Sequence, residues 1–310
     1  MKRIMNIAVL LGIIFSLIIG ITTPVFAVDR AEDDTDAINE KLGVPIVVLG
    51  DTLTNAQKEE TRKLLGVDDA STVDEYTVDG QDIAHYIDGN PNSRMFSSAK
   101  ITREEEGKGL TINIVTPENI TEVTNEMYAN ALLTAGAENA TVDVASPVKV
   151  TGHSALTGIY KAYDEDGAEL DKERMELAND ELGVATDLAK KEGMNEEKVT
   201  ELLAEIKKEI AEQNPATKED IERIVSEQLD KLEITLSEED RQLLINLFEK
   251  MRELDIDFDQ VKDQLEDISS KVKNKLEDLM EDEGFWQKVE NFFKKIIEAL
   301  RNFIIGILGD

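Results

Sequence analysis

Cysteine is absent from the 310-residue sequence, and histidine occurs only at His85 and His153. The missing thiols exclude disulfides, thiolate nucleophiles and cysteine-ligated metals. Two histidines cannot complete a zinc site with three histidine ligands, and neither belongs to an H-E-x-x-H pattern. The sequence therefore designates no catalytic, cofactor-binding or metal-binding residue, and we expect no cofactor.

Basic residues are scarce relative to acidic ones, 34 against 66, which gives a formal net charge of -32 at pH 7. Such a chain repels phosphodiester backbones, so we expect no nucleic acid partner. Aromatic residues make up 5% of the chain, and the single tryptophan is Trp286. A carboxylate-dependent cell-wall hydrolase would need two acids roughly 5 to 10 Å apart and aromatic platforms for sugar rings. This enzyme is the alternative hypothesis, because the many acids single out no pair.

The first 27 residues have the three parts of a secretory signal peptide. Lys2 and Arg3 form the basic start, an apolar run covers residues 7–21, and the segment ends at Ala27. Cleavage there would release a mature chain that is secreted or held on the extracellular face of the cell envelope. The apolar run is shorter than the roughly 20 residues of a transmembrane helix. An uncleaved N-terminal anchor is the alternative.

Residues 28–44 predict a disordered acidic leader, since six acids and two bases accompany few apolar residues. Residues 45–165 alternate β-type runs with helical patterns, which indicates an α+β or α/β domain with a mixed sheet. A capping-box pattern at Thr54 and Gln57 starts one helix, and Gly136 ends another. The expected strands cover residues 45–49, 72–78, 97–102, 110–115 and 141–145.

Residues 166–283 lack β-type runs, and their apolar residues recur at helical spacing in a strongly charged background. Pro215 ends one helix, and Thr217 and Ser237 each precede an aspartate by three residues, as N-caps do. These signals predict an all-α helical bundle. The near-heptad spacing over residues 261–279 leaves an elongated coiled-coil arm as the alternative. Residues 284–310 follow as an amphipathic C-terminal helix.

A distinctive motif runs from Glu126 to Gly136 with the sequence E-M-Y-A-N-A-L-L-T-A-G. It continues through Ala140, Val142, Val144, Pro147, Val150, Gly152, Ala155-Leu156, Gly158 and Lys161-Ala162-Tyr163. This passage resembles the YpuA-like family, exported proteins of low-GC Gram-positive bacteria that contain a domain of unknown function. The likeness extends more loosely from V-L-G-D-T-L-T at residues 48–54 to the last helix. The resemblance implies export and a shared architecture, and it supplies no catalytic residue, substrate or cofactor.

The sequence G-H-S-A-L at residues 152–156 lies between a β-type run and a helical one, which is the setting of a nucleophile elbow. The second glycine of G-x-S-x-G is replaced by Leu156, and no histidine follows Ser154 to act as its base. We therefore expect no serine hydrolase. The segment instead predicts a turn in which the Ser154 hydroxyl caps the next helix. His85 is expected at the surface.

An acidic turn follows the end of this helix. Asp164, Asp166, Gly167 and Glu173 match positions 3, 5, 6 and 12 of an EF-hand calcium loop. The first ligand position holds Ala162, and position 8 holds a glutamate where a hydrophobic residue belongs. An acidic turn between domains is therefore expected, with a calcium site as the alternative.

The C-terminal segment has apolar residues every three or four positions, with Lys288, Lys294, Lys295 and Arg301 on the opposite face. Its bases exceed its acids by one, whereas residues 28–284 hold 28 bases and 63 acids. Such a helix fits a membrane surface or an envelope protein partner, or it closes the protein's own bundle. Membrane or partner contact is predicted for Phe285, Trp286, Phe292, Phe293, Ile296, Leu300, Phe303, Ile304 and Ile307.

Taken as a whole, the patterns favour an exported envelope protein that binds a ligand or partner without catalysing a reaction. In this hypothesis the α/β half presents a binding surface. The helical half and the C-terminal helix associate with a membrane or a partner.

Overall fold

The computed structural model describes residues 42–168 and 170–281, which belong to one compact unit, Glu40–Asp310. The expected signal peptide and the expected C-terminal helix lie outside the described residues. In chain order the elements are β1 (Ile46–Gly50), α2 (Asn55–Leu64), the short 3-10 helix η1 (Ala70–Thr72), β2 (Asp74–Val78), α3 (Gly80–Ile87), β3 (Ser98–Arg103), β4 (Leu110–Ile114), α4 (Asn125–Ala135), β5 (Ala140–Ala145), α5 (Ala155–Glu165), α6 (Lys172–Ala189), α7 (Glu196–Gln213), α8 (Lys218–Lys231), α9 (Glu238–Glu253), η2 (Asp259–Val261) and α10 (Lys262–Glu281).

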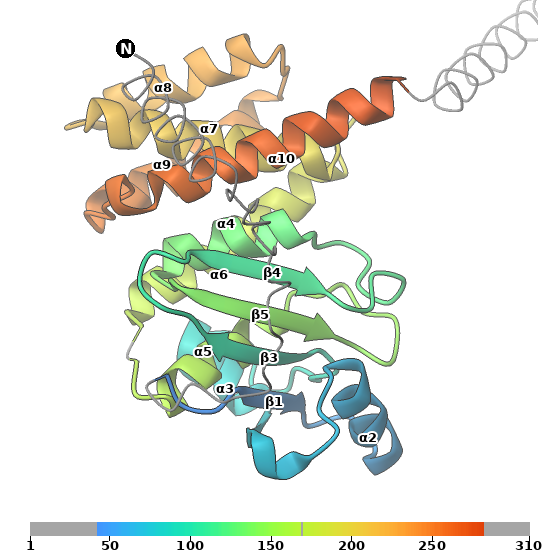
Figure 1. Cartoon of the computed structure of the whole chain (residues 1–310). Helices are drawn as coiled ribbons and strands as arrows, with labels where there is room; N and C mark the ends of the chain where they lie inside the picture. The colour runs from blue at the N-terminus through green and yellow to red at the C-terminus, as the bar shows by residue number, and fades with distance from the viewer. Residues whose placement is uncertain (1–41, 169, 282–310) are drawn as a thin grey trace, which may run out of the picture. The chain divides into compact units, whose positions relative to one another are not determined.

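The strands form one mixed sheet in the order β2-β1-β3-β5-β4. Figure 1 shows β1, β3, β5 and β4 following one another in this order. β1 is parallel to β2, β5 is parallel to β4, and β3 is antiparallel to both β1 and β5. All strands except β3 therefore share one direction, and their carboxyl ends meet at the edge of the sheet where β3 begins. In open α/β sheets, ligands bind in the crevice outside the carboxyl ends of the strands. The topology thus favours this edge for a ligand site.

Local signals in the sequence account for the elements. The strands predicted from β-type runs are present, with ends that differ by no more than two residues. Thr54 and Gln57 form the predicted capping box of α2, and Gly136 ends α4 with a φ of 85°. The hydroxyls of Thr217 and Ser237 accept hydrogen bonds from the first turns of α8 and α9. A mixed sheet followed by a run of helices confirms the predicted fold class.

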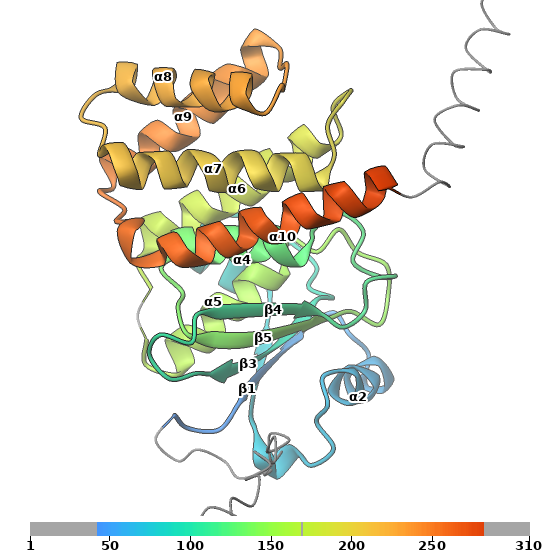
Figure 2. The same cartoon turned by 45° about the horizontal axis from the view of Figure 1, so that its top comes forward.

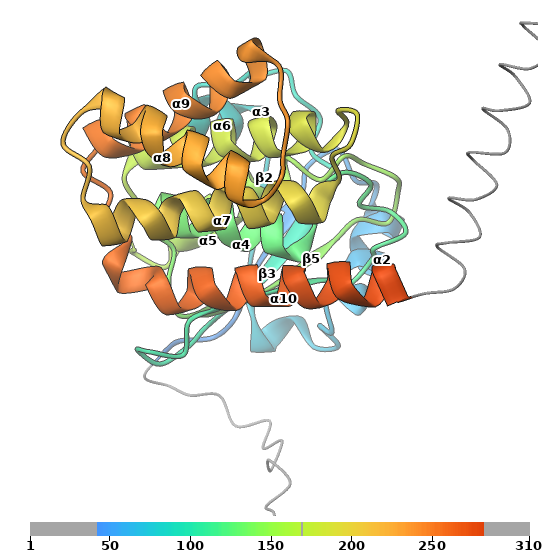
Figure 3. The same ribbon diagram turned by 90° about the horizontal axis from the view of Figure 1, so that it is seen from above.

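Helices cover one face of the sheet in two layers. α5 lies against β1, β2 and β3, and α4 lies against β4. α6, α7 and α10 pack on α4, and α8 and α9 contact α7 and α6 respectively. Figures 2 and 3 show α7 and α10 running side by side over α4. On the other face, Leu65 and Val67 at the end of α2 form a separate buried cluster with Val47 and Leu49 of β1.

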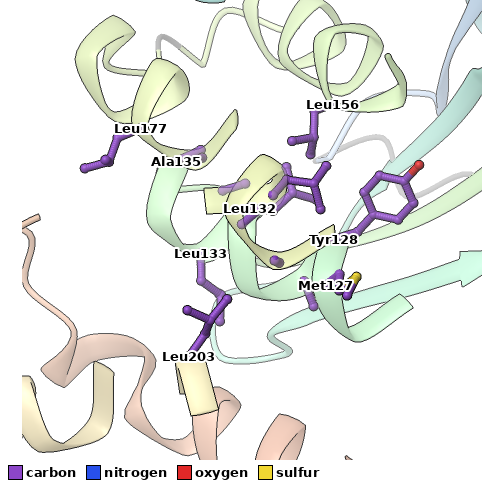
Figure 4. Packing of buried hydrophobic residues seen from close by; sticks show 14 of the residues in the cluster. Met127, Tyr128, Leu132, Leu133, Ala135, Leu156, Leu177 and Leu203 are labelled. Atoms are coloured by element: carbon purple, nitrogen blue, oxygen red, sulfur yellow. The ribbon is translucent and has the colours of Figure 1, made fainter. Parts of the chain in front are cut away.

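One hydrophobic cluster extends from the sheet into the helical layers and continues across residue 166. It includes Val48 of β1 and Phe248 of α9, which are both fully buried. α4 lies at its centre: Leu133 points toward Leu203 of α7, whereas Tyr128 lies on the other side of the helix (Figure 4). A helix packed on several sides needs apolar residues around its circumference, which explains the A-N-A-L-L-T-A stretch of the motif.

Candidate functional site

A cavity of about 540 Å³ opens at the edge where the parallel strands end. The segment before β3 and the segment between β5 and α5 form most of its wall, and α3, α5 and α6 complete it. Its lining residues are Ile83, Ile87, Ser93, Arg94, Phe96, Lys149, Val150, Thr151, Gly152, His153, Ser154, Thr157 and Asn179. The cavity therefore includes most of the G-H-S-A-L segment.

The turn at Gly152 is held in place by α4. The hydroxyl of Tyr128, which is fully buried, donates a hydrogen bond of 2.6 Å to the Gly152 carbonyl. Gly152 has a φ of +106°, and a Cβ at this position would lie 2.8 Å from both Tyr128 Oη and Ile120 Cγ2. Any other residue would be strained and would clash here. The tyrosine of the E-M-Y motif and Gly152 together fix the cavity wall.

His153 and Ser154 are adjacent in the chain but have different roles. His153 Nε2 lies 3.0 Å from Thr186 Oγ1, and burial lowers the pKa of His153 against the opposing effect of the Glu122 carboxylate. Ser154 occupies the N-cap position of α5 with φ -68° and ψ -13°, and its side chain makes no capping hydrogen bond. The prediction that this hydroxyl caps the helix is wrong, because capping uses an extended backbone such as that of Thr54.

The charged side chains at the cavity are cationic. Arg94 and Lys149 both line it and are exposed, and none of the described residues in its lining is an aspartate or a glutamate. The Arg94 guanidinium lies 5.3 Å from the centroid of the Phe96 ring. Ile83 and Ile87 of α3 add aliphatic surface to the same cavity. A positive rim and an apolar wall thus meet in a protein whose overall charge is strongly negative.

Thr157, on the first turn of α5, is a buried polar residue in the lining. It is 0% exposed, and its hydroxyl has no hydrogen-bond partner among the described residues. Buried helical threonines can donate to the carbonyl four residues earlier. Thr61 does so over 2.8 Å and Thr200 over 2.7 Å in this protein. The Thr157 hydroxyl departs from this pattern, which leaves a hydrogen-bonding group beside the cavity.

Comparison with known proteins places this region in a family. Residues 49–268 match the family described as "Protein of unknown function (DUF1002)". The chain belongs to this family. "Uncharacterized protein YpuA" of Bacillus subtilis (strain 168) is 37% identical over 202 residues, which cover 63% of this chain and 67% of the relative. The resemblance to the YpuA-like family is therefore confirmed, and no solved structure matches the chain.

Two further cavities have carboxylates in their lining. Asp267 in one and Asp68 in the other have no ion-pair partner among the described residues, whereas the glutamates are paired. A cavity of about 370 Å³ beside β4 and α10 includes Glu126, which lies 2.8 Å from the Lys275 ammonium. A cavity of about 430 Å³ beside α2 includes Glu59 and Glu75, which lie 2.7 and 2.6 Å from the Arg62 guanidinium. A glycoside hydrolase instead needs two carboxyl groups that face one substrate bond.

The EF-hand-like turn has protein partners for its two aspartates. Asp164 accepts a hydrogen bond of 2.8 Å from the Tyr86 hydroxyl, and Asp166 lies 3.1 Å from the Arg103 guanidinium. Gly167 makes the turn with a φ of +77°. Over residues 42–168 and 170–281, no group of three or more histidine, aspartate or glutamate side chains is placed to hold a metal ion.

A buried ion pair between helices is the polar feature that the sequence did not indicate. Lys207 Nζ lies 2.6 Å from Glu181 Oε1, with side chains 0% and 1% exposed. Lys207 also donates to the carbonyl and side-chain oxygen of Asn130, at 2.9 and 2.8 Å, and Thr134 donates to Glu181 at 2.6 Å. Burial lowers the pKa of Lys207, and the Glu181 carboxylate opposes that shift. The pair joins α4, α6 and α7.

The predicted membrane or partner contacts between residues 285 and 307 lie outside the described residues. Among the helices that the structure describes, none is both long and apolar enough to cross a membrane. His85 is exposed, as predicted, and its ring packs edge-on to Tyr86 at a centroid distance of 4.7 Å.

Proposed function

We propose that the protein is an exported binding protein without catalytic activity, and that its ligand occupies the cavity at the start of α5. The observation that carries the proposal is the cavity itself, with a volume of about 540 Å³ at the carboxyl ends of the parallel strands. Cavities of roughly 300 to 1,000 Å³ hold small organic ligands. Export is supported by the signal-peptide pattern of residues 1–27.

The side chains around the cavity favour binding over catalysis. A serine nucleophile needs a base within hydrogen-bond reach, and the base needs a third group that orients it. The His153 imidazole is engaged with Thr186, and the Ser154 hydroxyl makes no capping bond. The described lining also contributes no carboxylate that could serve as a general base. These groups are suited to contacting a ligand.

A second part of the proposal concerns residues 285–308, which we assign to contact with a membrane surface or an envelope protein. Their apolar periodicity and their excess of bases support this role. Deletion of residues 285–310 is expected to leave a folded protein that no longer co-sediments with anionic lipid vesicles. A full-length protein that ignores vesicles, together with a truncated form that loses its helical circular dichroism, would place this segment in the core instead.

The cavity is tested by filling it. A thermal-shift screen of anionic, neutral and cationic small molecules is expected to identify a class that raises the melting temperature of the wild type. Thr151→Trp places a large ring at the cavity, and it should abolish this stabilisation. Thr235→Trp, at an exposed position outside the cavity, should retain it. Equal stabilisation of both variants, or chemical turnover of a ligand, would overturn the proposal.

A further inference from the structure

We propose that the cavity binds small organic molecules that carry a phosphate group. The inference rests on the proposed function and names the class of ligand. It is drawn from three features of the cavity: the start of α5, which lacks a side-chain cap, the unpartnered Thr157 hydroxyl, and two cations without an ion-pair partner among the described residues.

The first feature is the N-terminus of α5, an 11-residue helix whose first turn lies at the cavity. Helix N-termini present backbone N–H groups and the positive end of the helix dipole, and both favour anions. In α2 the Thr54 side chain occupies this end as a cap. In α5 the Ser154 side chain does not, and the Ala155 and Leu156 N–H groups donate to the Gly152 and His153 carbonyls at 3.0 and 3.4 Å. Among the described residues, the backbone N–H groups of His153 and Ser154 have no acceptor, and these two could receive a ligand oxygen.

The second feature is Thr157, whose fully buried hydroxyl lacks a partner among the described residues. Six buried side-chain atoms of the described residues lack a partner, and Thr157 Oγ1 is the one that belongs to the lining of this cavity. Buried polar groups are nearly always hydrogen-bonded, so its position beside the cavity points to an acceptor or donor supplied by a ligand. Thr157 is the third residue of α5 and lies in the first turn, at the same helix end. An oxyanion at the start of α5 would supply the acceptor.

The third feature is the charge of the lining. Neither Arg94 nor Lys149 takes part in an ion pair among the described residues, although acids outnumber bases 66 to 34 in the chain. Lys161 of α5 differs in this respect, because its ammonium is paired with the Asp82 carboxylate at 2.9 Å. Two uncompensated cations match a phosphate dianion, whereas a carboxylate would neutralise one of them. The arginine fork in particular suits a phosphate.

The size and the apolar wall of the cavity identify the rest of the ligand. Ile83, Ile87, Phe96 and Val150 contribute hydrocarbon surface. Inorganic phosphate would leave most of about 540 Å³ empty, and it would leave this surface in contact with water. A phosphate ester with a compact apolar skeleton matches both the cationic rim and the apolar wall of the cavity.

Calorimetric titration of the full-length protein with phenyl phosphate, inorganic phosphate and benzyl alcohol tests the proposal. Phenyl phosphate should bind saturably, inorganic phosphate should bind at least about tenfold more weakly, and benzyl alcohol should show no saturable binding. Arg94→Gln with Lys149→Gln should weaken phenyl phosphate binding by about tenfold or more, because charge-assisted hydrogen bonds are lost. Lys63→Gln with Lys108→Gln changes the net charge equally at exposed positions outside the cavity, and it should change affinity by less than about twofold.

Thr157→Val separates a ligand contact from a structural role. It removes an unsatisfied buried hydroxyl at constant shape, so the melting temperature should stay constant or rise while phenyl phosphate affinity falls by about tenfold. Thr61→Val removes a satisfied hydroxyl, so it should lower the melting temperature and leave affinity unchanged.

The results that would contradict the phosphate inference differ from those that would contradict the proposed binding function. Equal weakening by both charge variants would show that net charge, and not the cavity, attracts phosphate, and this would overturn the inference. Stabilisation by a neutral or cationic ligand that Thr151→Trp abolishes would also overturn it, while the proposed binding function would stand. If no ligand in the screen responds to Thr151→Trp, both proposals fail.

Discussion

Two polar regions of the protein are buried to a similar degree but differ in how their hydrogen bonds are satisfied. Around Lys207, the ammonium donates to oxygens of Asn130 and Glu181, and Thr134 donates to the Glu181 carboxylate. Both charged groups of the pair are satisfied there, whereas the Asn130 amide nitrogen has no partner among the described residues. Around Thr157, the hydroxyl has no partner among the described residues. Polar groups that the protein satisfies itself contribute to holding its elements together. Of the unpaired groups among the described residues, Thr157 is the one in the cavity lining, and the proposed ligand would pair with it.

The largest expected effect comes from removing one partner of the buried ion pair between Lys207 and Glu181. Lys207→Met leaves the Glu181 carboxylate 1% exposed without its cation, and we expect a loss of about 3 to 5 kcal/mol in the free energy of unfolding. Guanidinium denaturation measures this loss. The double variant Lys207→Met with Glu181→Leu should recover much of it, because no unpaired charge stays buried. No recovery would mean that the loss comes from packing and not from the orphaned charge.

The next effect is a dependence of stability on pH that arises from Glu205 of α7. This glutamate is another buried group with protein partners. Burial would raise its pKa, but the Ser269 hydroxyl and the ammonium groups of Lys208 and Lys231 lower it from 4.5 to about 2. An acid with a lowered pKa in the folded state contributes stability above pH 4.5, and this contribution is lost as the pH falls toward 2. Water screens the half-exposed Lys231 ammonium, so we expect a contribution of about 1 to 2 kcal/mol.

Denaturation from pH 6 down to pH 2 measures the Glu205 contribution. Glu205→Gln should lower stability at pH 6 and flatten the curve between pH 4.5 and 2. Glu219→Gln, at an exposed position of α8, is the matched control and should leave the curve unchanged. A Glu205→Gln curve as steep as that of the wild type would assign the acid sensitivity to other carboxylates.

The fold could be predicted from the sequence where the signals were local. Alternating runs located the strands, and caps such as Thr54 and Ser237 located helix starts, because these patterns depend on neighbours within one turn. The burial of Lys207 and Glu181 depends instead on α7 and α6 packing on α4, which is a contact between distant segments. In sequence, both residues resemble the solvent-facing charges of their helices.

The candidate site was predicted only in part for the same reason. The segment 152–156 stood out as a turn between a strand and a helix, and the structure confirms that position. The failed cap depends on the backbone angles of Ser154, which no residue type reveals. The convergence of Arg94 from before β3 with Lys149 from after β5 depends on the sheet order. The change of pattern at residue 166 is real in secondary structure, yet the hydrophobic cluster continues across it.

A smaller effect is expected at the cavity wall. Gly152→Ala introduces a Cβ 2.8 Å from Tyr128 Oη at a φ of +106°, so we expect a loss of about 1 to 3 kcal/mol in stability. Thermal denaturation measures it. Gly183→Ala in α6 has no atom within 4 Å of its Cβ, and it should gain about 0.5 to 1 kcal/mol. If Gly152→Ala leaves the stability unchanged, the cavity wall at Gly152 can adapt to a side chain and is not fixed.

The smallest expected effect is at the EF-hand-like turn, where no calcium-dependent shift of the melting temperature is predicted. A specific calcium site would stabilise the folded state by mass action as the ion concentration rises. Asp164 and Asp166 already contact Tyr86 and Arg103, so binding calcium would require both aspartates to give up these partners. Melting in chelator and in millimolar calcium at matched ionic strength should therefore give the same temperature. The contrary result would be a saturable rise of the melting temperature with calcium that the double variant Asp164→Asn with Asp166→Asn abolishes. It would show that carboxylates with protein partners still bind a ligand here. The distinction drawn between the Lys207 and Thr157 regions would then fail.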